Sequence, residues 1–370
     1  MTDASESRLP HDDLWPRAGG WPAWVGGAGG AGGDGADAGA DAADAGVDAA
    51  DAGVDAADAG VDAADAGAPF DAVVLGVPAW RTSLSPTGAH ATPAAVRDAL
   101  RRFSPTLLGT TALGPGPLDL EELLRIADAG DVDEPDGPEG EQRVRDRVRE
   151  LTASTRRVIA LGGDNSITYA TAQGAGAGGL ITLDAHFDLR DGISNGSPVR
   201  RLIEDGMDPR RIVQLGIADF ANSAAYARRA AELGITVVTL DELSGRSLPE
   251  VAEQALRIAG AGGGAVHLDI DVDVCDRAVA PGCPASVPGG LAAWELRALV
   301  RALGSDARVR SADIVEVDAT ADAPDGRTVR LAALCVLELL AGLALVPAAA
   351  AAPAQAPTST SMPTSEEGTA

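Results

Sequence analysis

Apolar runs rich in β-branched residues alternate with amphipathic stretches along most of this chain. A short apolar run between turn residues predicts a buried strand, whereas apolar positions that recur every three or four residues predict a helix. The expected strands are 72–77, 157–161, 179–183, 212–215, 236–240, 266–271 and 313–317. The expected helices include 93–103, 141–151, 221–233, 249–259 and 292–303. This alternation predicts an α/β fold of three layers, with helices on both faces of a central, mostly parallel sheet.

Both ends of the chain lack this pattern. From Ala40 to Gly67 the heptad Val/Ala-Asp-Ala-Ala-Asp-Ala-Gly recurs. In a helix its aspartates would share a face and repel, and each glycine would cost about 1 kcal/mol, so we expect disorder. An acidic coiled coil is disfavoured because the repeat offers only Val and Ala to bury. We predict a disordered Ala/Gly/Asp tail at 1–68, a folded domain at 69–346 and a disordered Ala/Pro/Ser/Thr tail at 347–370.

The net charge and the cysteine content limit the binding partners and the cellular compartment that we expect for this chain. The formal charge of −26 argues against a nucleic-acid partner, because phosphate binding needs clustered basic side chains. Three scattered cysteines, an odd number, give no disulfide framework and fit a reducing cytoplasm. The amino terminus has no signal-peptide pattern. The apolar stretch 329–352 contains Arg330, Glu338 and Pro347, so it predicts a buried helix and then a tail rather than a membrane span.

Acidic side chains and a histidine follow one of the predicted strands. Asp184, His186 and Asp188 come directly after the apolar run 179–183. Alternate residues along a strand share one face, so these three side chains are expected to point the same way. Close, buried carboxylates repel one another and are expensive to desolvate unless a cation compensates them, so the triplet suggests a metal.

A second strand repeats this arrangement. Asp269, Asp271 and Asp273 alternate with apolar residues and are expected on one face. Either triplet alone could also be the exposed face of an edge strand. The same placement recurs elsewhere, because Asn165 and Glu316 also close apolar runs. Carboxyl ends of parallel strands meet at one edge of a sheet, so we expect one shared active site there.

Four motifs resemble those of the ureohydrolases, the arginase and agmatinase superfamily. They are 162–166, 184–188, 271–273 and 316–318. Four further segments are similar to the formimidoylglutamase branch of that superfamily. These are 195–198, 214–217, 280–284 and 288–291. The resemblance implies an arginase-like three-layer fold, a small-molecule substrate and a homo-oligomer, either a trimer or a hexamer.

The resemblance also implies a set of metal ligands. The matching positions are Asp184, His186, Asp188, Asp271 and Asp273, with Asn165 at a sixth. In the superfamily two Mn²⁺ ions occupy such ligands and bridge a water, and a carboxylate-rich set suits Mn²⁺ better than Zn²⁺. Paired ions lower the pKa of that water and provide hydroxide, which is expected to attack the amidine carbon and release the glutamate nitrogen.

Four further residues are assigned to the substrate by position. Glu316 is expected to hold the cationic formamidinium through a charge-assisted hydrogen bond. Arg190 and Arg200 could bind carboxylates in a bidentate way, although surface ion pairs are an equal alternative for both. Asn195, like Asn165, stands where typical arginases carry a histidine.

Three functions remain open at this point. The first is hydrolysis of N-formimidoyl-L-glutamate to L-glutamate and formamide, a step of histidine degradation, which Asn165 and Asn195 favour. The second is hydrolysis of a guanidino compound such as agmatine, arginine or guanidinobutyrate, with release of urea. The third is a catalytically impaired, metal-poor binding subunit, which the five retained ligands disfavour.

The acidic repeat is expected to be dispensable. A chain shortened to begin near Gly67 should keep its activity and its fold, because the repeat supplies neither apolar surface nor chemistry to the domain. Turnover and thermal unfolding of the shortened and full chains test this. An equal loss of activity and fold would contradict it.

Overall fold

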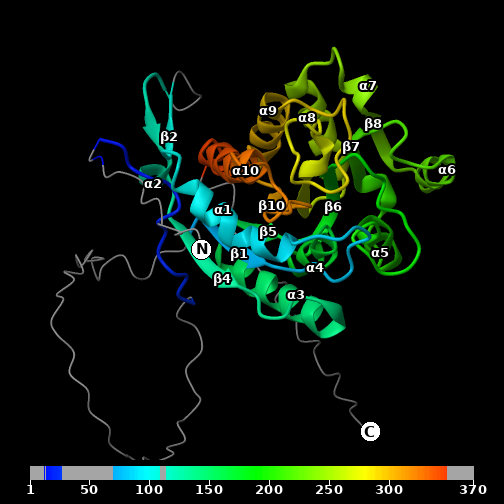
Figure 1. The fold of residues 1–370 in the computed structure, drawn as a ribbon, viewed down its shortest axis with the longest axis horizontal. Helices are drawn as coiled ribbons and strands as arrows, with labels where there is room; N and C mark the ends of the chain where they lie inside the picture. Colours follow the sequence, from blue (N-terminus) through cyan, green and yellow to red (C-terminus); the bar gives the residue numbers. More distant parts are fainter. Residues whose placement is uncertain (1–11, 13, 27–69, 109–113, 348–370) are drawn as a thin grey trace, which may run out of the picture. The chain divides into compact units, whose positions relative to one another are not determined.

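The computed structural model describes residues 12, 14–26, 70–108 and 114–347 (Figure 1). Most of the predicted amino-terminal tail, with its repeat, lies outside the described residues, as does the predicted carboxy-terminal tail after Pro347. The predicted tails therefore stay predictions over those stretches.

Eight strands form one sheet in the order β4-β1-β5-β10-β9-β6-β7-β8. All neighbouring pairs are parallel. The strands are β1 Ala72–Val77, β4 Ile126–Asp131, β5 Arg157–Gly162, β6 Ala177–Leu183, β7 Ile212–Ile217, β8 Thr236–Thr239, β9 Ala265–Asp271 and β10 Val309–Val315. A separate antiparallel pair joins β2 Thr106–Leu107 to β3 Leu118–Asp119. The predicted α/β fold with a parallel sheet is confirmed.

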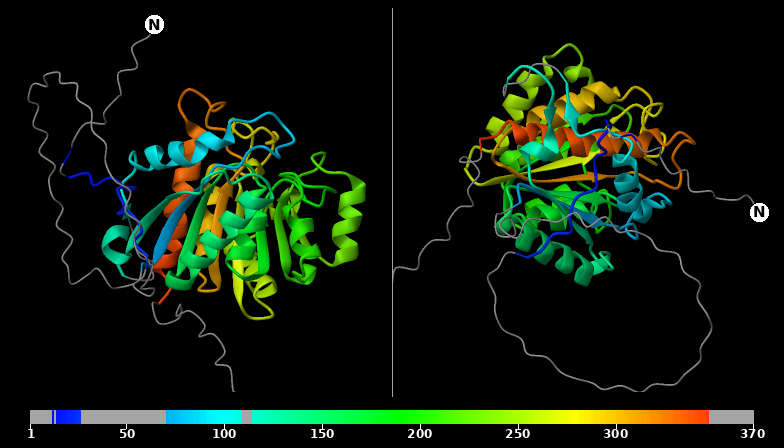
Figure 2. Two further views of the ribbon diagram at one scale, coloured as in Figure 1. Left: turned by 90° about the horizontal axis from the view of Figure 1, so that it is seen from below. Right: turned by 90° about the vertical axis from the view of Figure 1, so that its left-hand side faces the viewer.

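Helices cover both faces of this sheet. One face carries α1 Thr92–Leu100, α8 Leu248–Ala259, α9 Ala293–Gly304 and α10 Arg327–Ala344. The other carries α3 Gly137–Ser154, α4 Ile167–Gly174 and α5 Pro198–Glu204. Figure 2 shows these two layers on opposite sides of the strands. The remaining helices are α2 Leu120–Leu123, α6 Ala224–Leu233 and α7 Leu240–Leu243.

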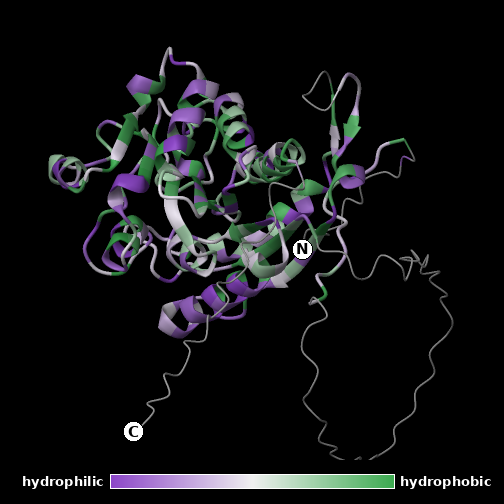
Figure 3. Ribbon diagram, turned by 180° about the vertical axis from the view of Figure 1, so that it is seen from behind, coloured by the Kyte–Doolittle hydropathy of each residue, from purple (hydrophilic) through white to green (hydrophobic). Residues whose placement is uncertain are grey.

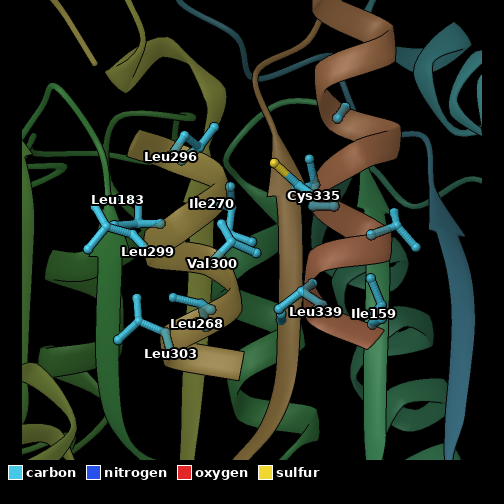
Figure 4. Close-up of a cluster of buried hydrophobic side chains, with 14 of the residues drawn as sticks. Ile159, Leu183, Leu268, Ile270, Leu296, Leu299, Val300, Leu303, Cys335 and Leu339 are labelled. Atoms are coloured by element: carbon cyan, nitrogen blue, oxygen red, sulfur yellow. The ribbon is translucent and has the colours of Figure 1, made fainter. Parts of the chain in front are cut away.

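Alternation along the strands divides the core into layers. In β5, Ile159 and Leu161 belong to the apolar cluster under α9 and α10, whereas Val158 and Ala160 face α3 and α4. Successive side chains of a strand point to opposite faces, so a strand covered on both sides must be apolar throughout. Figure 4 shows the larger cluster, in which Leu299 and Leu339 pack over the central strands. The helix α3 is solvated outside and largely hydrophilic in Figure 3.

Several elements were not predicted from the sequence, among them β4 and α5. The strand β4 reads Ile-Ala-Asp-Ala-Gly-Asp, which lacks β-branched residues beyond Ile126. It is an edge strand, paired on one side with β1. The helix α5 is short and follows Pro198, where the proline fits the first turn. Tertiary pairing rather than local propensity forms β4.

Residues 14–24 differ from the predicted tail. The backbone amide of Ala18 donates to Phe103 O at 3.0 Å, and that of Trp24 donates to Asp128 O at 2.8 Å. Trp21 donates from its indole nitrogen to Glu121 at 2.8 Å, and the Trp24 ring lies 4.5 Å from the Arg147 guanidinium carbon. These two aromatic side chains dock the segment on the domain, so a chain that begins near Gly67 would lose these contacts together with the repeat.

The described helices include none with the length and hydropathy that a membrane span requires.

A buried arginine ties the layers together. Arg157 is fully buried at the start of β5, and burial lowers its pKa to about 9. Its guanidinium donates to the backbone oxygens of Val309 at 2.9 Å, Gly304 at 2.7 Å, Leu339 at 3.1 Å and Asp306 at 3.1 Å. One side chain therefore joins β5 to the α9–β10 connection and to α10.

Replacing Arg157 by methionine should destabilise the fold. The substitution fills similar volume but leaves buried carbonyls without donors, so we expect a loss of about 3 kcal/mol or more in the free energy of unfolding. Urea denaturation measures this loss. The matched control is Arg102→Met, an exposed arginine, which should change stability by less than about 0.5 kcal/mol. Equal stability of the two variants would contradict the role of Arg157.

Candidate metal-dependent active site

The predicted site residues meet at the carboxyl ends of the four central strands. Asn165 follows β5, the segment 184–188 follows β6, Asp271 ends β9 and Glu316 follows β10. These strands are neighbours in the order β5-β10-β9-β6. A cavity of about 330 Å³ opens there. The predicted site residues that line it are His186, Asp188, Arg190, Asn195, Asp271, Asp273 and Glu316.

The convergence was predicted, but the expected strand geometry was wrong. The strand β6 ends at Leu183, so Asp184, His186 and Asp188 lie in a loop rather than alternating along a strand. The carboxylate of Asp184 accepts the backbone amide of His186 at 2.6 Å, which turns the chain. Asp188 has φ of +52°, a left-handed conformation. A local turn therefore presents the ligands.

In the second acidic segment an aspartate carboxylate likewise accepts the backbone amide of the residue two positions later. Asp271 is the last residue of β9, and its carboxylate accepts the backbone amide of Asp273 at 2.8 Å. Asp273 lies in a 3-10 turn, Val272–Val274. Asp269 does not line the cavity: it is fully buried beside Asp313 on the neighbouring strand. Asp269 and Asp271 therefore share a face of β9, as predicted, whereas Asp273 lies beyond the strand and the prediction is wrong for it.

Three of the expected ligands form a group that a cation fits. Side-chain atoms of Asp184, His186 and Asp273 all lie within 4.8 Å of one another. The Nδ1 of His186 is 3.0 Å from Asp273 Oδ2 and 3.5 Å from Asp184 Oδ1. The Oδ2 of Asp184 is buried and has no hydrogen-bond partner among the described residues. A buried carboxylate oxygen without a donor is the chemistry that a divalent cation satisfies.

Asn165 lies beside the other two carboxylates, with its amide nitrogen toward them. That nitrogen donates to Asp188 Oδ2 at 2.5 Å and lies 3.4 Å from Asp271 Oδ2. Its oxygen accepts the hydroxyl of Thr168 at 2.6 Å. An ionised carboxylate only accepts, so the donor end of the amide must face it. The structure thus places Asn165 among the expected ligands with its amide nitrogen toward them, and its role as a sixth metal ligand stays a prediction.

Burial and mutual repulsion control protonation in the site. Burial raises the pKa of Asp184 to about 6, and it raises the pKa values of Asp188 and Asp271 well above their usual range. Neighbouring carboxylates add to each shift. Burial alone would lower the pKa of His186, but the carboxylates of Asp273 and Asp184 outweigh it and raise this pKa to about 12. The metal-free site therefore retains protons near neutral pH.

Glu316 is held at the cavity by two asparagines. Its Oε1 accepts the backbone amide of Asn165 at 2.7 Å and the side-chain amide of Asn195 at 2.9 Å. Glu316 has φ of +63°, and burial raises its pKa to about 8. The other end of the Asn195 amide accepts the backbone amide of Leu84 at 3.0 Å. Asn195 thus joins the loop at Leu84 to Glu316.

The two candidate arginines differ. Arg190 lines the cavity, whereas Arg200 does not. The Arg200 guanidinium donates to Arg190 O at 2.6 Å and also contacts Gly192 O and Glu204. Its donors are used in bracing the loop, which argues against substrate binding by Arg200, although that role stays a prediction.

Asn222 was not predicted from the sequence. It accepts the backbone amide of Phe187 at 3.1 Å and donates to Ala185 O at 2.8 Å, which fixes the loop that carries the ligands. A single asparagine in a loop gives no sequence signal for this role. Cys283 is buried and does not line the cavity, and burial raises its pKa well above the usual range, so a nucleophilic thiol is disfavoured.

The comparison with protein families agrees with this geometry. The model of the arginase family matches residues 70–342. The chain belongs to the arginase family. The resemblance drawn from its motifs is confirmed, and the matched region contains every strand of the large sheet.

Two curated relatives of this arginase-family chain have different substrates in their names. The formimidoylglutamase of Halalkalibacterium halodurans is 35% identical over 282 residues, which cover 73% of this chain and 86% of the relative. The guanidinopropionase of Pseudomonas aeruginosa is 33% identical over 236 residues, which cover 60% of this chain and 73% of the relative.

Two solved structures share the fold. The formimidoylglutamase from Bacillus subtilis has a TM-score of 0.68 and 32% identity, covering 76% of this chain and 90% of its own. The Trypanosoma cruzi formiminoglutamase, solved with Mn²⁺, has a TM-score of 0.67 and 23% identity, covering 75% and 94%. At that identity the second comparison speaks only for the fold.

Metal binding should release protons and strengthen as the pH rises. The raised pKa values of Asp188, Asp271 and His186 keep protons on the metal-free site at pH 7, and a cation must displace them, while Asp184, with a pKa of about 6, loses its proton between pH 6 and pH 8. We expect the affinity for Mn²⁺ to increase between pH 6 and pH 8. Calorimetry in buffers with different ionisation enthalpies measures both the affinity and the protons released.

Asp184→Asn should weaken Mn²⁺ binding by about tenfold or more, since it removes a ligand charge. The control is Asp208→Asn, a surface aspartate that pairs with Arg210 and should leave the affinity unchanged. An affinity that does not vary with pH, or an equal effect of both substitutions, would argue against the site.

Proposed function

We propose that this chain is a metal-dependent hydrolase that cleaves the formimidoyl C–N bond of N-formimidoyl-L-glutamate. Water adds across that bond, so the products are formamide and L-glutamate, and the glutamate nitrogen leaves with a proton. The observation that carries the proposal is the pair of asparagines on Glu316, at positions where typical arginases carry histidine. The similarity to the formimidoylglutamases supports the same substrate.

The proposed metal sites use the acidic cluster. Asp184, His186, Asp188, Asp271 and Asp273 would hold Mn²⁺, because oxygen-rich sets with one imidazole suit that ion. Bound divalent ions supply Lewis acidity, which makes water a nucleophile at neutral pH. The Mn²⁺ in the Trypanosoma cruzi structure belongs to that protein and agrees with this choice.

The chain's own residues bind and orient the substrate. The Glu316 carboxylate accepts hydrogen bonds from the amidinium, and a cation at this position favours its ionised form despite burial. Asn195 orients that carboxylate through its 2.9 Å hydrogen bond. His186 is one-quarter exposed and borders the cavity, whereas Asp184 behind it is fully buried. The amidine carbon is thereby directed toward the acidic cluster.

A guanidino hydrolase is the second candidate, and the guanidinopropionase relative favours it. A guanidinium and a formamidinium present similar N–H groups to Glu316, so the same site could release urea. The homo-oligomer and the cytoplasmic location stay predictions from the sequence.

Parallel assays separate these candidates. The Mn²⁺-loaded protein is offered N-formimidoyl-L-glutamate, agmatine, arginine and guanidinobutyrate, and formamide, ammonia and urea are measured. We expect formamide from the first compound only. Urea from a guanidino compound would replace the proposal by the second candidate. If no compound gives a product and the metal content has been verified, the result would favour the third candidate, a catalytically impaired binding subunit.

Glu316→Gln tests the role of the carboxylate. The variant keeps the shape and the hydrogen-bond acceptor but removes the charge, so we expect kcat to fall about 100-fold or more with Mn²⁺ binding retained. Glu204→Gln, an exposed glutamate paired with Arg200, is the control and should keep most of the activity. Full activity of Glu316→Gln would remove Glu316 from the mechanism.

A further inference from the structure

One arginine in the cavity has no side-chain partner among the residues that the structure describes. Among the lining residues in the described part of the chain, Arg190 is the only arginine, and the chain has no lysine. The Arg190 side chain is exposed and makes no hydrogen bond or ion pair with any described residue. Its backbone is fixed, since its amide donates to Gly196 O at 3.0 Å and its carbonyl accepts from Arg200 at 2.6 Å.

Other arginines around the cavity are already engaged. Arg200 is used by two carbonyls and by Glu204. Arg229 donates to Leu189 O at 2.6 Å and to Asp191 at 2.8 Å. Arg277 donates to Cys283 O at 2.7 Å and to Pro284 O at 3.0 Å. These side chains brace loops, so Arg190 is left with its guanidinium available.

The stem of Arg190 lies against a glycine. A Cβ at Gly196 would stand 2.7 Å from Arg190 Cδ and 3.1 Å from its Nε, with Leu84 Cδ1 at 3.3 Å. Only a residue without a side chain leaves this space, so Gly196 permits the arginine to lie along the cavity wall. The guanidinium is thus positioned by its stem and not by an ion pair.

The charge of the remaining wall makes Arg190 decisive for selectivity. Asp188, Asp271, Asp273 and Glu316 line the same cavity and are suited to a cation or an amidinium. A guanidinium binds carboxylate bidentately and repels an ammonium group. A substrate with an amidine at one end and a carboxylate at the other matches both the acidic wall and Arg190. A cationic guanidine that carries an amine at its other end matches only the acidic wall.

We propose that Arg190 is the specificity residue of this cavity and that it binds a carboxylate of the substrate, so that the site selects anionic amidines or guanidino acids over cationic guanidines. This inference rests on the proposed hydrolase function of the cavity. It names the part of the substrate that the reaction does not change.

The test compares Arg190→Gln with the wild-type protein, both loaded with Mn²⁺. The substrates are N-formimidoyl-L-glutamate, N-formimidoyl-L-glutamine and N-formimidoyl-L-isoglutamine, the last two each lacking one carboxylate. We expect the substitution to raise KM for the first about 10- to 100-fold, the size of a charged hydrogen bond, with little change in kcat. One of the two amides should bind the variant and the wild-type protein equally.

Two further variants sharpen the result. Arg228→Gln is the matched control, because Arg228 is exposed on α6 and does not line the cavity, so KM should be unchanged. Gly196→Ala retains the arginine but displaces its stem and should raise KM by an intermediate amount. An unchanged KM for Arg190→Gln, or the same increase for all three substrates, overturns the inference.

The experiment distinguishes failure of the proposed reaction from failure of the inference about Arg190. If the protein instead releases urea, a preference for guanidinobutyrate over agmatine that Arg190→Gln abolishes supports the inference, and no such change overturns it. If nothing turns over, calorimetry of L-glutamate binding to the Mn²⁺-loaded proteins decides. Weaker binding to Arg190→Gln supports the role of Arg190, and equal binding overturns it.

Discussion

Burial of like charges at one edge of the sheet is the constraint on which the site depends. Asp184, Asp188, Asp271, Asp273 and Glu316 are each less than a tenth exposed and share one small region. Such a cluster is unstable unless protons, hydrogen-bond donors or cations compensate it. The fold supplies donors, including the amide of Asn165 toward Asp188 and the backbone amide of Ala185 toward Asp273 at 3.3 Å. Divalent cations would supply the rest.

The scaffold beneath this cluster is correspondingly rigid. Four central strands are covered on both faces, and Arg157 fixes β5 to β10, α10 and the end of α9 through four carbonyls. Asp188, in the loop after β6, and Glu316, directly after β10, both adopt left-handed backbone conformations. For residues other than glycine these conformations cost of order 1–3 kcal/mol, so the surrounding packing must hold them. Rigid strands and strained ends together aim the side chains into the cavity.

The cavity also has a division of charge. Its inner wall is acidic and suits cations, while the free guanidinium of Arg190 suits an anion. The neighbouring Arg200 and Arg229 stabilise the loops through carbonyls and carboxylates. Similar residues therefore have different roles, which depend on whether the fold provides partners for them.

The main strands and helices, and the edge of the sheet at which the site residues meet, follow from the pattern of residues along the chain. Apolar runs set the central strands, and motifs at their ends converge because parallel strands all point to one edge. The family could also be recognised from the sequence, since the expected ligands lie in short contiguous segments such as 184–188. These features involve residues that are close together in the chain, so the sequence alone is enough to recognise them.

The use of individual side chains depends instead on contacts that form when the chain folds. The tertiary structure paired the amide oxygen of Asn165 with Thr168, engaged Arg200 while leaving Arg190 free, and placed Asp269 away from the cavity. It also formed β4 against β1 and docked residues 14–24 on the domain. Each outcome depends on partners that are distant in the chain or on the exact path of a loop, and neither is recorded in hydrophobic periodicity.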